Sequence, residues 1–378
     1  MRIGLNAQVM YTGSGFRNAG VSRYTQAIVE RLAVNTDLEF VLYVNNSVRE
    51  IPFPIHGDMQ IRRAILPTSR TAVRAVWEQT VMPWRTFRDE LDVTHSFLNV
   101  SPLLGSGGHV LTIHDLSYIE EPAAHPLRRR LYLNIMSRLS AQRVQIILAD
   151  SWATRRDIVK HFNVDPAKIR VVYAAADSDM RPVSREDSED FRGKKGLPED
   201  YVLYLGTLEP RKNVDVLVRA FSKLRRSGYS GELILAGGKG WGYAAIEAAI
   251  EDEGLAGVVH FAGYIPREEQ HLWYNCAQFF VYPSAYEGFG LPVLEAMACG
   301  TPVITTTSSS LPEVAGDAGL LVTPGDSNEL ASVMIDLTES SGQRQVLHEA
   351  GLVRATHFSW DVTANKCLEA YRAASGHA

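Results

Sequence analysis

The stretch that decides the fold is EGFGLPVLE, residues 287–295, which follows an apolar run ending near Tyr282. Its two glycines, Gly288 and Gly290, permit a tight loop in which backbone N–H groups can approach a ligand. Pro292 suits the first turn of a helix. The stretch therefore predicts a buried strand, a loop and a helix start in succession. The unpaired N–H groups and the positive dipole end of such a helix form a site for an anion.

Two carboxylates flank this predicted anion site. Glu287 lies in the loop before it, and Glu295 lies about one helical turn further on, roughly 6 Å along the axis. One carboxylate can reach a sugar on one side of a diphosphate, and the other can reach ribose hydroxyls on the opposite side. Surface glutamates around an ordinary glycine turn are the alternative. The agreement of strand, double-glycine loop, proline and second glutamate weighs against that alternative.

Short apolar runs alternate with amphipathic stretches on both sides of this motif, which is typical of parallel sheets with helices between the strands. The first series predicts strands at residues 2–7, 39–44, 109–113 and 145–149, with helices at 21–32 and 153–162. The second series predicts strands at residues 201–205, 232–236, 258–261, 279–281 and 302–305, with helices at 214–224 and 291–298. The fold class is therefore α/β, with two βαβ-type halves.

The length of the chain also favours two domains, because 378 residues exceed what one core usually serves. We expect an N-terminal domain over residues 1–176 and a C-terminal domain over residues 177–358, joined by a linker at 174–182. Residues 360–374 read as one more helix. We expect the segment 359–378 to pack back on the first domain.

Composition narrows the classes of protein. The three cysteines are widely spaced and form no CxxC pair, no apolar run is long enough to span a bilayer, and the first residues lack a signal-peptide pattern. We therefore expect a cytoplasmic protein. Residues 1–176 carry a net charge of +6 and the remainder −11. The basic half favours an anionic partner, although a chance imbalance on solvated faces explains it equally well. We expect no nucleic-acid partner.

A second motif follows the first strand of the second series. It reads GTLEPRKN, residues 206–213, and includes Arg211 and Lys212. Ligands of open α/β sheets bind at the carboxyl ends of strands. Two cations at that place can neutralise a diphosphate, the guanidinium as a planar fork and the ammonium as a point charge. A solvated basic loop before a helix is the alternative.

The first half holds two weaker candidates. A glycine-rich loop, Gly13-Ser14-Gly15 and then Gly20, Val21 and Arg23, follows the first strand and opens a helix. It can approach a phosphate or an acceptor, or it can be a flexible turn. His114 follows the strand at 109–113. A histidine there can bond a sugar hydroxyl or share proton traffic, or it can be a structural residue.

Three other patterns carry less weight. Asp177 and Asp179 resemble a metal-binding DxD motif but fall in the predicted linker, so we expect no obligatory metal. The glycine loop after the first strand lacks a complete GxGxxG pattern, which argues against a nicotinamide dinucleotide site. The arginine-rich stretch from Arg128 to Arg143 is either a solvated basic helix or a surface for anionic lipid.

The motif from Glu287 to Val303 resembles the signature of the group 1, family 4 retaining glycosyltransferases. These enzymes have the GT-B fold, in which two Rossmann-like domains face each other across a cleft. The resemblance implies that residues 1–176 form the acceptor domain and residues 177–358 the nucleotide-sugar donor domain. The resemblance covers nearly the whole chain, from the glycine loop at Gly20 through His114 and the Arg211-Lys212 loop to the C-terminal helix. The sequence of residues 206–213 is similar to that found in bacterial enzymes that build surface polysaccharides, many of which are mannosyltransferases.

The resemblance implies roles for individual residues. Glu287 would contact the hydroxyls of the donor sugar, Glu295 would hold the ribose, and His114 would lie beside the C6 region of the sugar. The diphosphate would be bound by Arg211 and Lys212. The remaining donor-binding residues would be Gly206, Thr207, Gly288, Phe289, Gly290 and Leu291, and the acceptor loop would contain Gly20, Val21 and Arg23. Many relatives have arginine where this chain has Thr207, so Arg211 would carry more of the diphosphate binding.

The sequence thus predicts a retaining hexosyltransferase that uses GDP-mannose or a UDP-hexose and acts on a glycan or lipid-linked acceptor. Negative charge that grows on the departing diphosphate would be stabilised by preorganised cations and helix N–H groups. The domains would close around the substrates. An epimerase or phosphorylase with the same fold, and a non-catalytic protein that binds sugar nucleotides, are the alternatives. The four intact charged residues of the two motifs argue against the last.

Overall fold

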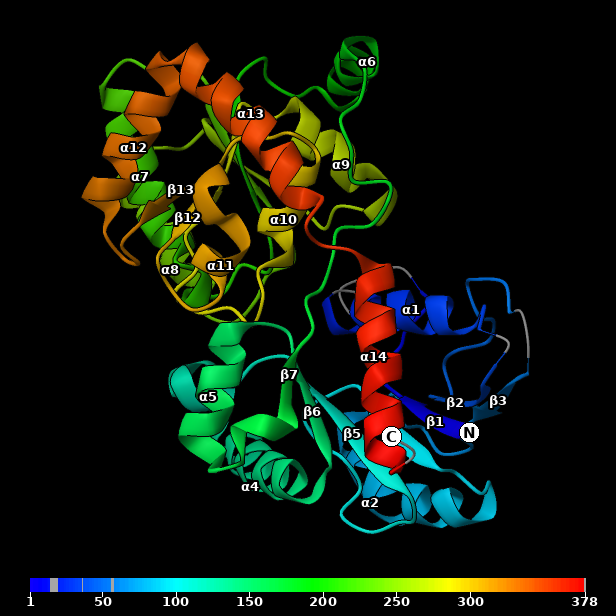
Figure 1. Ribbon diagram of the computed structural model, residues 1–378. Helices are drawn as coiled ribbons and strands as arrows, with labels where there is room; N and C mark the ends of the chain where they lie inside the picture. Colours follow the sequence, from blue (N-terminus) through cyan, green and yellow to red (C-terminus); the bar gives the residue numbers. More distant parts are fainter. Residues whose placement is uncertain (14–19, 36, 56–57, 377–378) are drawn as a thin grey trace. The chain divides into compact units, whose positions relative to one another are not determined.

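The structure is a computed structural model that describes residues 1–13, 20–35, 37–55 and 58–376. The chain divides into two compact units, one made of Met1–Ala174 and Ser359–Ala378 and the other of Ala175–Phe358. Each unit is built around one parallel β-sheet with helices packed on it (Figure 1). The predicted fold class, two parallel α/β domains, is confirmed.

The first unit contains a seven-stranded sheet in the order β3-β2-β1-β4-β5-β6-β7. Its strands are β1 (Arg2–Ala7), β2 (Glu39–Val44), β3 (Met59–Arg63), β4 (Val93–Ser96), β5 (Gly108–Ile113), β6 (Ile146–Ala149) and β7 (Ile169–Val171). Its helices are α1 (Gly20–Leu32), α2 (Thr71–Arg88), α3 (Ser117–Glu120), α4 (Leu127–Arg143), α5 (Trp152–Phe162) and α14 (Trp360–Ser375).

The predicted strands of the first unit all form, and the three strands of this unit that the prediction omitted have weak signals. The edge strand β3 is half exposed and reads MQIRR. The strand β4 is buried throughout but reads VTHS, so its three polar side chains hide it from an apolar pattern. The strand β7 has only three residues.

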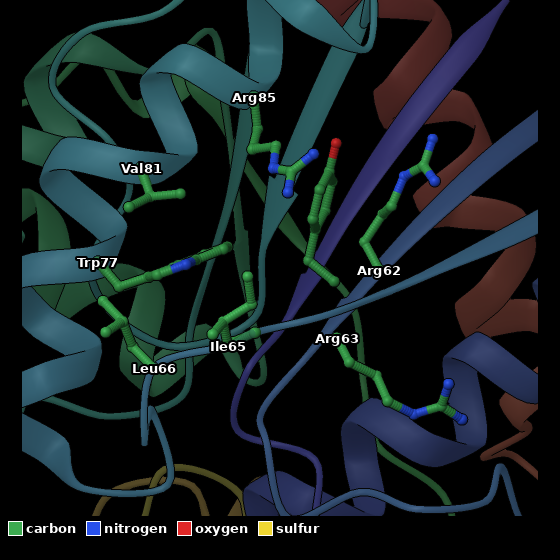
Figure 2. Close-up of a pocket in the computed structure, with 9 residues that line it drawn as sticks. Arg62, Arg63, Ile65, Leu66, Trp77, Val81 and Arg85 are labelled. Carbon is green, nitrogen blue, oxygen red and sulfur yellow. The ribbon is translucent and has the colours of Figure 1, made fainter.

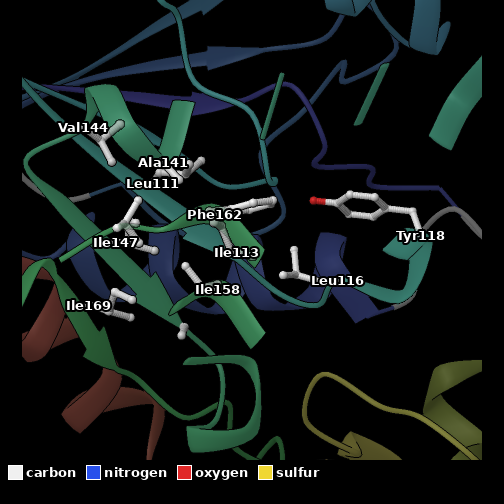
Figure 3. Close-up of a cluster of buried hydrophobic side chains, with 12 residues drawn as sticks. Leu111, Ile113, Leu116, Tyr118, Ala141, Val144, Ile147, Ile158, Phe162 and Ile169 are labelled. Carbon is white, nitrogen blue, oxygen red and sulfur yellow. The ribbon is translucent and has the colours of Figure 1, made fainter. Parts of the chain in front are cut away.

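Apolar side chains of β5 and β6 pack against α4 and α5 to form one core of the first unit (Figure 3). Leu111 and Ile147 of the strands are fully buried, as are Ile158 and Phe162 of α5. Because this core fixes the strand ends, it also fixes the loops that follow β5 and β6, where ligands of parallel sheets bind.

The helix α14 joins the first unit, as its place in the division of the chain indicates. The hydroxyl of Tyr371 lies 2.7 Å from Nδ1 of His95 on β4, and Arg31 of α1 lies 2.8 Å from the carboxylate of Asp361. A Cβ at Gly108 would lie 2.2 Å from the carbonyl oxygen of Ala374, so the helix approaches the sheet backbone more closely than any other residue would permit.

The second unit contains a six-stranded sheet in the order β10-β9-β8-β11-β12-β13. Its strands are β8 (Tyr201–Leu205), β9 (Glu232–Ala236), β10 (Val259–Gly263), β11 (Phe279–Tyr282), β12 (Val303–Thr306) and β13 (Leu320–Val322). Its helices are α6 (Arg185–Lys195), α7 (Val214–Arg226), α8 (Ala244–Asp252), α9 (Arg267–Cys276), α10 (Leu291–Ala298), α11 (Leu311–Ala315), α12 (Ser327–Glu339) and α13 (Ser341–Ala355). The strand order reverses between β8 and β11, which is where ligands bind in open sheets of this kind.

Candidate active site

The loop between β11 and α10 is held by two serines that follow β12. The hydroxyl of Ser310 donates to the carbonyl oxygens of Glu287 and Phe289, at 3.0 and 2.8 Å. The hydroxyl of Ser309 accepts a bond from the backbone N–H of Glu287 at 2.8 Å. These three bonds fix the backbone on both sides of Gly288. The loop that the sequence singled out is therefore preorganised by its neighbour.

The helix α10 begins directly after Gly290, as the sequence predicts. Gly290 has φ of +100°, a left-handed conformation that side chains other than glycine rarely adopt. A Cβ there would also lie 2.7 Å from the side chain of Leu311. Pro292 occupies the first turn, where an N–H would have no partner in the helix, and the N–H of Val293 donates to the carbonyl oxygen of Gly290 at 3.0 Å. The start of the helix, with the positive end of its dipole, is the arrangement that binds anions.

The predicted cations lie beside this loop. Arg211 and Lys212 belong to a single 3₁₀ turn, Pro210–Lys212, which follows β8. The ammonium of Lys212 pairs with the carboxylate of Glu287 and donates to the hydroxyl of Tyr282 at 2.8 Å. The structure thus brings together two residues that are 75 positions apart in the sequence.

The guanidinium of Arg211 binds the same loop. Its Nη1 lies 3.4 Å from Glu287 and donates to the carbonyl oxygen of Tyr286, and its Nη2 lies 2.7 Å from Glu209. Two cations and two carboxylates therefore form one buried cluster. The sequence predicts that Arg211 and Lys212 bind a diphosphate. In this cluster a diphosphate would have to compete with Glu209 and Glu287 for these two cations.

Burial and charge act in opposite directions on this cluster. Burial alone would raise the pKa of Glu287, but Lys212 and then Arg211 outweigh it and hold the pKa at about 2. Burial lowers the pKa of Lys212, and the attraction of Glu287 opposes this shift only in part. The cost of burying Lys212 offsets part of the attraction. The Lys212–Glu287 pair therefore stabilises the unit less than the lowered pKa of Glu287 alone would suggest. Glu287 remains ionised at every pH at which an enzyme of this kind works.

Glu295 lies inside the unit. It is one turn along α10, as predicted, but only 1% of it is exposed, and one of its oxygens accepts a bond from the hydroxyl of Tyr274 at 3.2 Å. Its predicted contact with a ribose stays a prediction. The pairing with Tyr274 links α10 to α9 and gives Glu295 a structural partner that the sequence did not indicate.

Gly206 and Thr207 follow β8 at the edge where the strand order reverses. The N–H of Gly206 donates to Ala236 at 2.9 Å, and a Cβ at Gly237 would lie 1.9 Å from the carbonyl oxygen of Gly206. The loops after β8 and β9 therefore touch backbone to backbone. Thr207 is exposed, so its side chain is available to a ligand.

In the first unit, His114 forms a buried pair with Asp150, which follows β6. Its Nδ1 lies 2.6 Å from Asp150 and its Nε2 lies 2.8 Å from the carbonyl oxygen of Phe97. Burial favours the neutral ring, but the carboxylate of Asp150 outweighs it and raises the pKa of His114 above its usual value. Burial also raises the pKa of Asp150, so one proton lies in the hydrogen bond between this carboxyl group and Nδ1 of His114. The predicted sugar contact of His114 and its part in proton traffic stay predictions.

The predicted acceptor loop lies at the start of α1. Ser14 and Gly15 fall outside the described residues. Gly20 is the first residue of α1 and Val21 lines a cavity together with His114, so the structure brings these predicted residues to one place. Arg23 is buried in α1, with 9% of it exposed.

Asp177 of the DxD pattern bonds the guanidinium of Arg267 at 2.5 Å. Within the described residues, no three histidine, cysteine or acidic side chains gather as a metal would require. Asp177 is thus engaged in an ion pair in this conformation.

Both units match models of glycosyltransferase families. A family model described as glycosyl transferases group 1 matches residues 186–354, and a model described as glycosyltransferase family 4 matches residues 19–179. The chain is 32% identical over 368 residues to O-antigen chain mannosyltransferase B of Escherichia coli, an alignment that covers 93% of this chain and 96% of that protein.

The chain belongs to the group 1, family 4 glycosyltransferases.

Solved structures agree with this assignment at the level of the fold. Sucrose-phosphate synthase of Thermosynechococcus elongatus is similar with a TM-score of 0.78 and 22% identity, over 98% of each chain. HepE of Anabaena, solved in complex with UDP and glucose, is similar with a TM-score of 0.73 and 18% identity, again over 98% of each chain. The GT-B fold expected from the resemblance is confirmed.

Several residues of this glycosyltransferase escaped the sequence reasoning. Asp150 directly follows β6, so the rule that ligand groups follow parallel strands could have found it. Ser309 and Ser310 follow β12 in the same way. Tyr282 lies within an apolar strand and Tyr274 within an amphipathic helix, where no sequence pattern separates a polar partner from a core aromatic residue.

Proposed function

We propose that this glycosyltransferase transfers mannose from GDP-mannose to a glycan acceptor with retention of configuration and without an obligatory metal. The observation that carries the proposal is the buried cluster of Glu287, Lys212 and Arg211 beside the start of α10, at the place where the strand order reverses. The choice of mannose is supported by the name of the Escherichia coli relative, which matches over nearly the full length of both chains.

The cluster can supply most of the catalysis through electrostatics. As the bond to the sugar breaks, negative charge grows on the departing diphosphate, and Arg211, Lys212 and the N–H groups of α10 are already in place to stabilise it. Glu287 holds both cations and stays ionised, so it can also accept hydrogen bonds from the sugar while positive charge develops there. We propose that the acceptor oxygen attacks from the face that the diphosphate leaves, which retains the configuration.

The proposal is tested by a donor screen. GDP, UDP and ADP are titrated calorimetrically, and the matching sugar nucleotides are then incubated with a mannose-terminated oligosaccharide. We expect GDP to bind most tightly and GDP-mannose to yield an extended glycan whose new anomeric proton has the α configuration by NMR. Tighter binding of UDP, or a β product, would contradict the donor or the stereochemistry proposed.

Transfer is expected to be independent of divalent metal, because Arg211, Lys212 and the start of α10 lie together where we propose that the diphosphate binds. We expect the initial rate to change by less than about twofold in 5 mM EDTA after dialysis against the chelator. Loss of activity that Mg²⁺ or Mn²⁺ restores would contradict this expectation and would direct attention to Asp177.

We also propose peripheral contact of the first unit with anionic membrane. The stretch that the sequence left open is the helix α4, which contains five arginines and no acidic residue. Its exposed apolar side chains recur every four residues, at Leu127, Leu131, Ile135 and Leu139. No helix within the described residues combines the length and apolarity that crossing a bilayer requires. Arginines that stand among exposed apolar side chains can bind anionic headgroups while the apolar side chains contact the membrane surface.

A second feature of the same unit supports membrane contact. Between β3 and α2 lies a hollow of about 140 Å³, around which Arg62, Arg63 and Arg85 are placed (Figure 2). Arg62 and Arg85 share one buried carboxylate, that of Asp89, at 3.9 and 3.8 Å. Beside them, Ile65 is almost completely exposed. The hollow therefore keeps excess positive charge next to an apolar side chain.

Binding to vesicles is expected to depend on both charge and apolar surface. The chain should sediment with vesicles that contain 30% phosphatidylglycerol and not with pure phosphatidylcholine, and raising NaCl from 0.05 to 0.5 M should weaken binding about tenfold or more. Ile135→Gln should weaken it further. Val346→Gln, at a similarly exposed position on α13 of the second unit, is the matched control and should change nothing. If the chain sediments with neither type of vesicle, the proposed membrane contact is contradicted and α4 is a solvated helix.

A further inference from the structure

We propose that a cavity between α2 and α4 in the first unit binds the terminal neutral hexose of the acceptor, and that Glu78 is the side chain that recognises its hydroxyl groups. The inference rests on the proposed transfer to a glycan and names the acceptor subsite on this chain. The predicted residues Val21 and His114 line the same cavity.

The cavity has the size and the lining of a site for one sugar ring. Its volume is about 210 Å³, which is below the range of roughly 300–1,000 Å³ typical of sites for larger ligands. Arg74 and Glu78 reach it from α2, Tyr132 from α4, and Asn99 from the loop after β4. Polar groups that converge from several elements onto a small cavity with aromatic walls are what a sugar requires, because it presents hydroxyls at its rim and C–H groups on its faces.

Glu78 is buried without full compensation. Only 7% of it is exposed, and its two polar contacts, to Asn6 at 3.5 Å and to Arg74 at 3.8 Å, both involve Oε1. Among the described residues no hydrogen bond reaches Oε2. Burial outweighs Arg74 and Asn6 and raises the pKa of Glu78 to about 7. A buried carboxyl group with an unused oxygen in a cavity is unfavourable unless a ligand donates hydrogen bonds to it.

Tyr132 provides a second group of this kind. Its hydroxyl oxygen is buried, and among the described residues it has no hydrogen-bond partner. Tyr132 comes from α4 and Glu78 from α2, so the two groups approach the cavity from different helices. One hydroxyl of a bound ring can donate to the carboxylate while another accepts from the phenol.

The charges of the cavity are mixed and give a phosphate no purely cationic site. Arg74 and Arg129 line the cavity together with Glu78 and Asp115, so a phosphate would meet two carboxylates as well as the cations. Arg74 already faces Glu78, which reduces its attraction for a second anion. A neutral sugar enters the cavity without the cost of removing a charged group from water. Its hydroxyls can also donate hydrogen bonds to a carboxylate, whereas ionised phosphate oxygens only accept them.

The inference is tested with methyl α-D-mannopyranoside as the probe. Saturation-transfer NMR on the full chain should detect binding of the probe, and Glu78→Gln should weaken it about tenfold or more, because the charged acceptor is lost. Tyr132→Phe removes one oxygen only and should weaken binding about three- to tenfold. Thermal unfolding checks that each variant is folded, and if Glu78→Gln is not, Tyr132→Phe still decides. Inorganic phosphate should compete weakly. Stronger competition by phosphate than by mannose would overturn the inference.

The pH profile separates recognition from a merely structural role. Because hydroxyls that donate to Glu78 favour its ionised form, the affinity for the probe should rise as pH increases from 6 to 8 in the wild type. The titratable or charged groups that face the cavity with Glu78 are Arg74, His114, Asp115, Tyr118, His125, Arg129 and Tyr132. The readout is therefore the difference between wild type and Glu78→Gln. An identical profile in the two proteins would overturn the inference.

GDP titration distinguishes the two possible failures. The predicted GDP-binding residues lie in the second unit, and the cavity lies in the first. If GDP does not bind the wild type, the proposed function fails whatever the probe does. If GDP binds and the two variants bind the probe as tightly as the wild type, only the assignment of the cavity fails.

Discussion

Glu287→Gln is expected to lower kcat by roughly 10²-fold or more while changing the affinity for GDP little. The substitution preserves size and most hydrogen bonding but removes the charge that the site maintains at every working pH, since the pKa of Glu287 is held at about 2. The lost charge matters most when positive charge develops on the sugar, so the effect falls on the transition state rather than on the bound nucleotide. Steady-state kinetics and calorimetric titration of GDP measure the two quantities.

Glu295→Ala is the matched comparison. If Glu295 holds the ribose, its contribution is the same in the ground and transition states, and the variant should mainly raise the donor KM and weaken GDP binding. Tyr274→Phe removes the hydroxyl that bonds Glu295 and shows how much of the change comes from that contact. A near-normal kcat in Glu287→Gln, or unchanged GDP affinity in Glu295→Ala, would contradict the placement of the two carboxylates on either side of the phosphate site.

Lys212→Met is expected to lower kcat/KM by roughly 10²–10³-fold and also to reverse the pH dependence of stability near this site. In the wild type Glu287 has a pKa below its ordinary value, so its pairing stabilises the fold above pH 4.5 and is lost as pH falls toward 2. Without Lys212, Arg211 is the remaining cation that opposes burial, and we expect burial to outweigh it and raise the pKa of Glu287. The variant should then become less stable as pH rises toward neutrality. Thermal unfolding between pH 2 and 8 measures both slopes.

The double variant Lys212→Met, Glu287→Gln provides the control. Removing one partner of a buried pair leaves an uncompensated charge, whereas removing both leaves none, so the double variant should recover stability relative to Lys212→Met but not activity. Additive losses of stability would show that the two side chains do not act as a pair. The recovery should be modest, because burial lowers the pKa of Lys212 and so opposes part of the stabilisation.

The features that the sequence predicted well are those carried by strong local patterns. The apolar runs of β1, β8 and β11 required buried parallel strands, and the glycine and proline before and inside α10 required a loop and a helix start. The family resemblance supplied the fold of both units from the same residues. Prediction was weakest where polar residues are buried, as in β4, because a pattern of apolar residues cannot reveal them.

The partners of the site residues could not be predicted, because they depend on side-chain geometry. The motif GTLEPRKN indicates cations but not that Lys212 pairs with Glu287 in the ligand-free chain. The sequence likewise treats Glu78 as one charge on an amphipathic helix. Only the fold shows that Glu78 lines a cavity and that, among the described residues, its contacts all involve one carboxylate oxygen.

The return of α14 to the first unit has a consequence for synthesis on the ribosome. His95 and Tyr371 are 276 residues apart, and the second unit is translated entirely between them. The second unit can therefore complete its sheet while the first still lacks a helix, and the face of β4 and β5 that α14 covers stays open to chaperones for most of translation. Nascent chains arrested after residue 358 should be recognised as incomplete in the first unit alone, with proteases cutting there before they cut in the second.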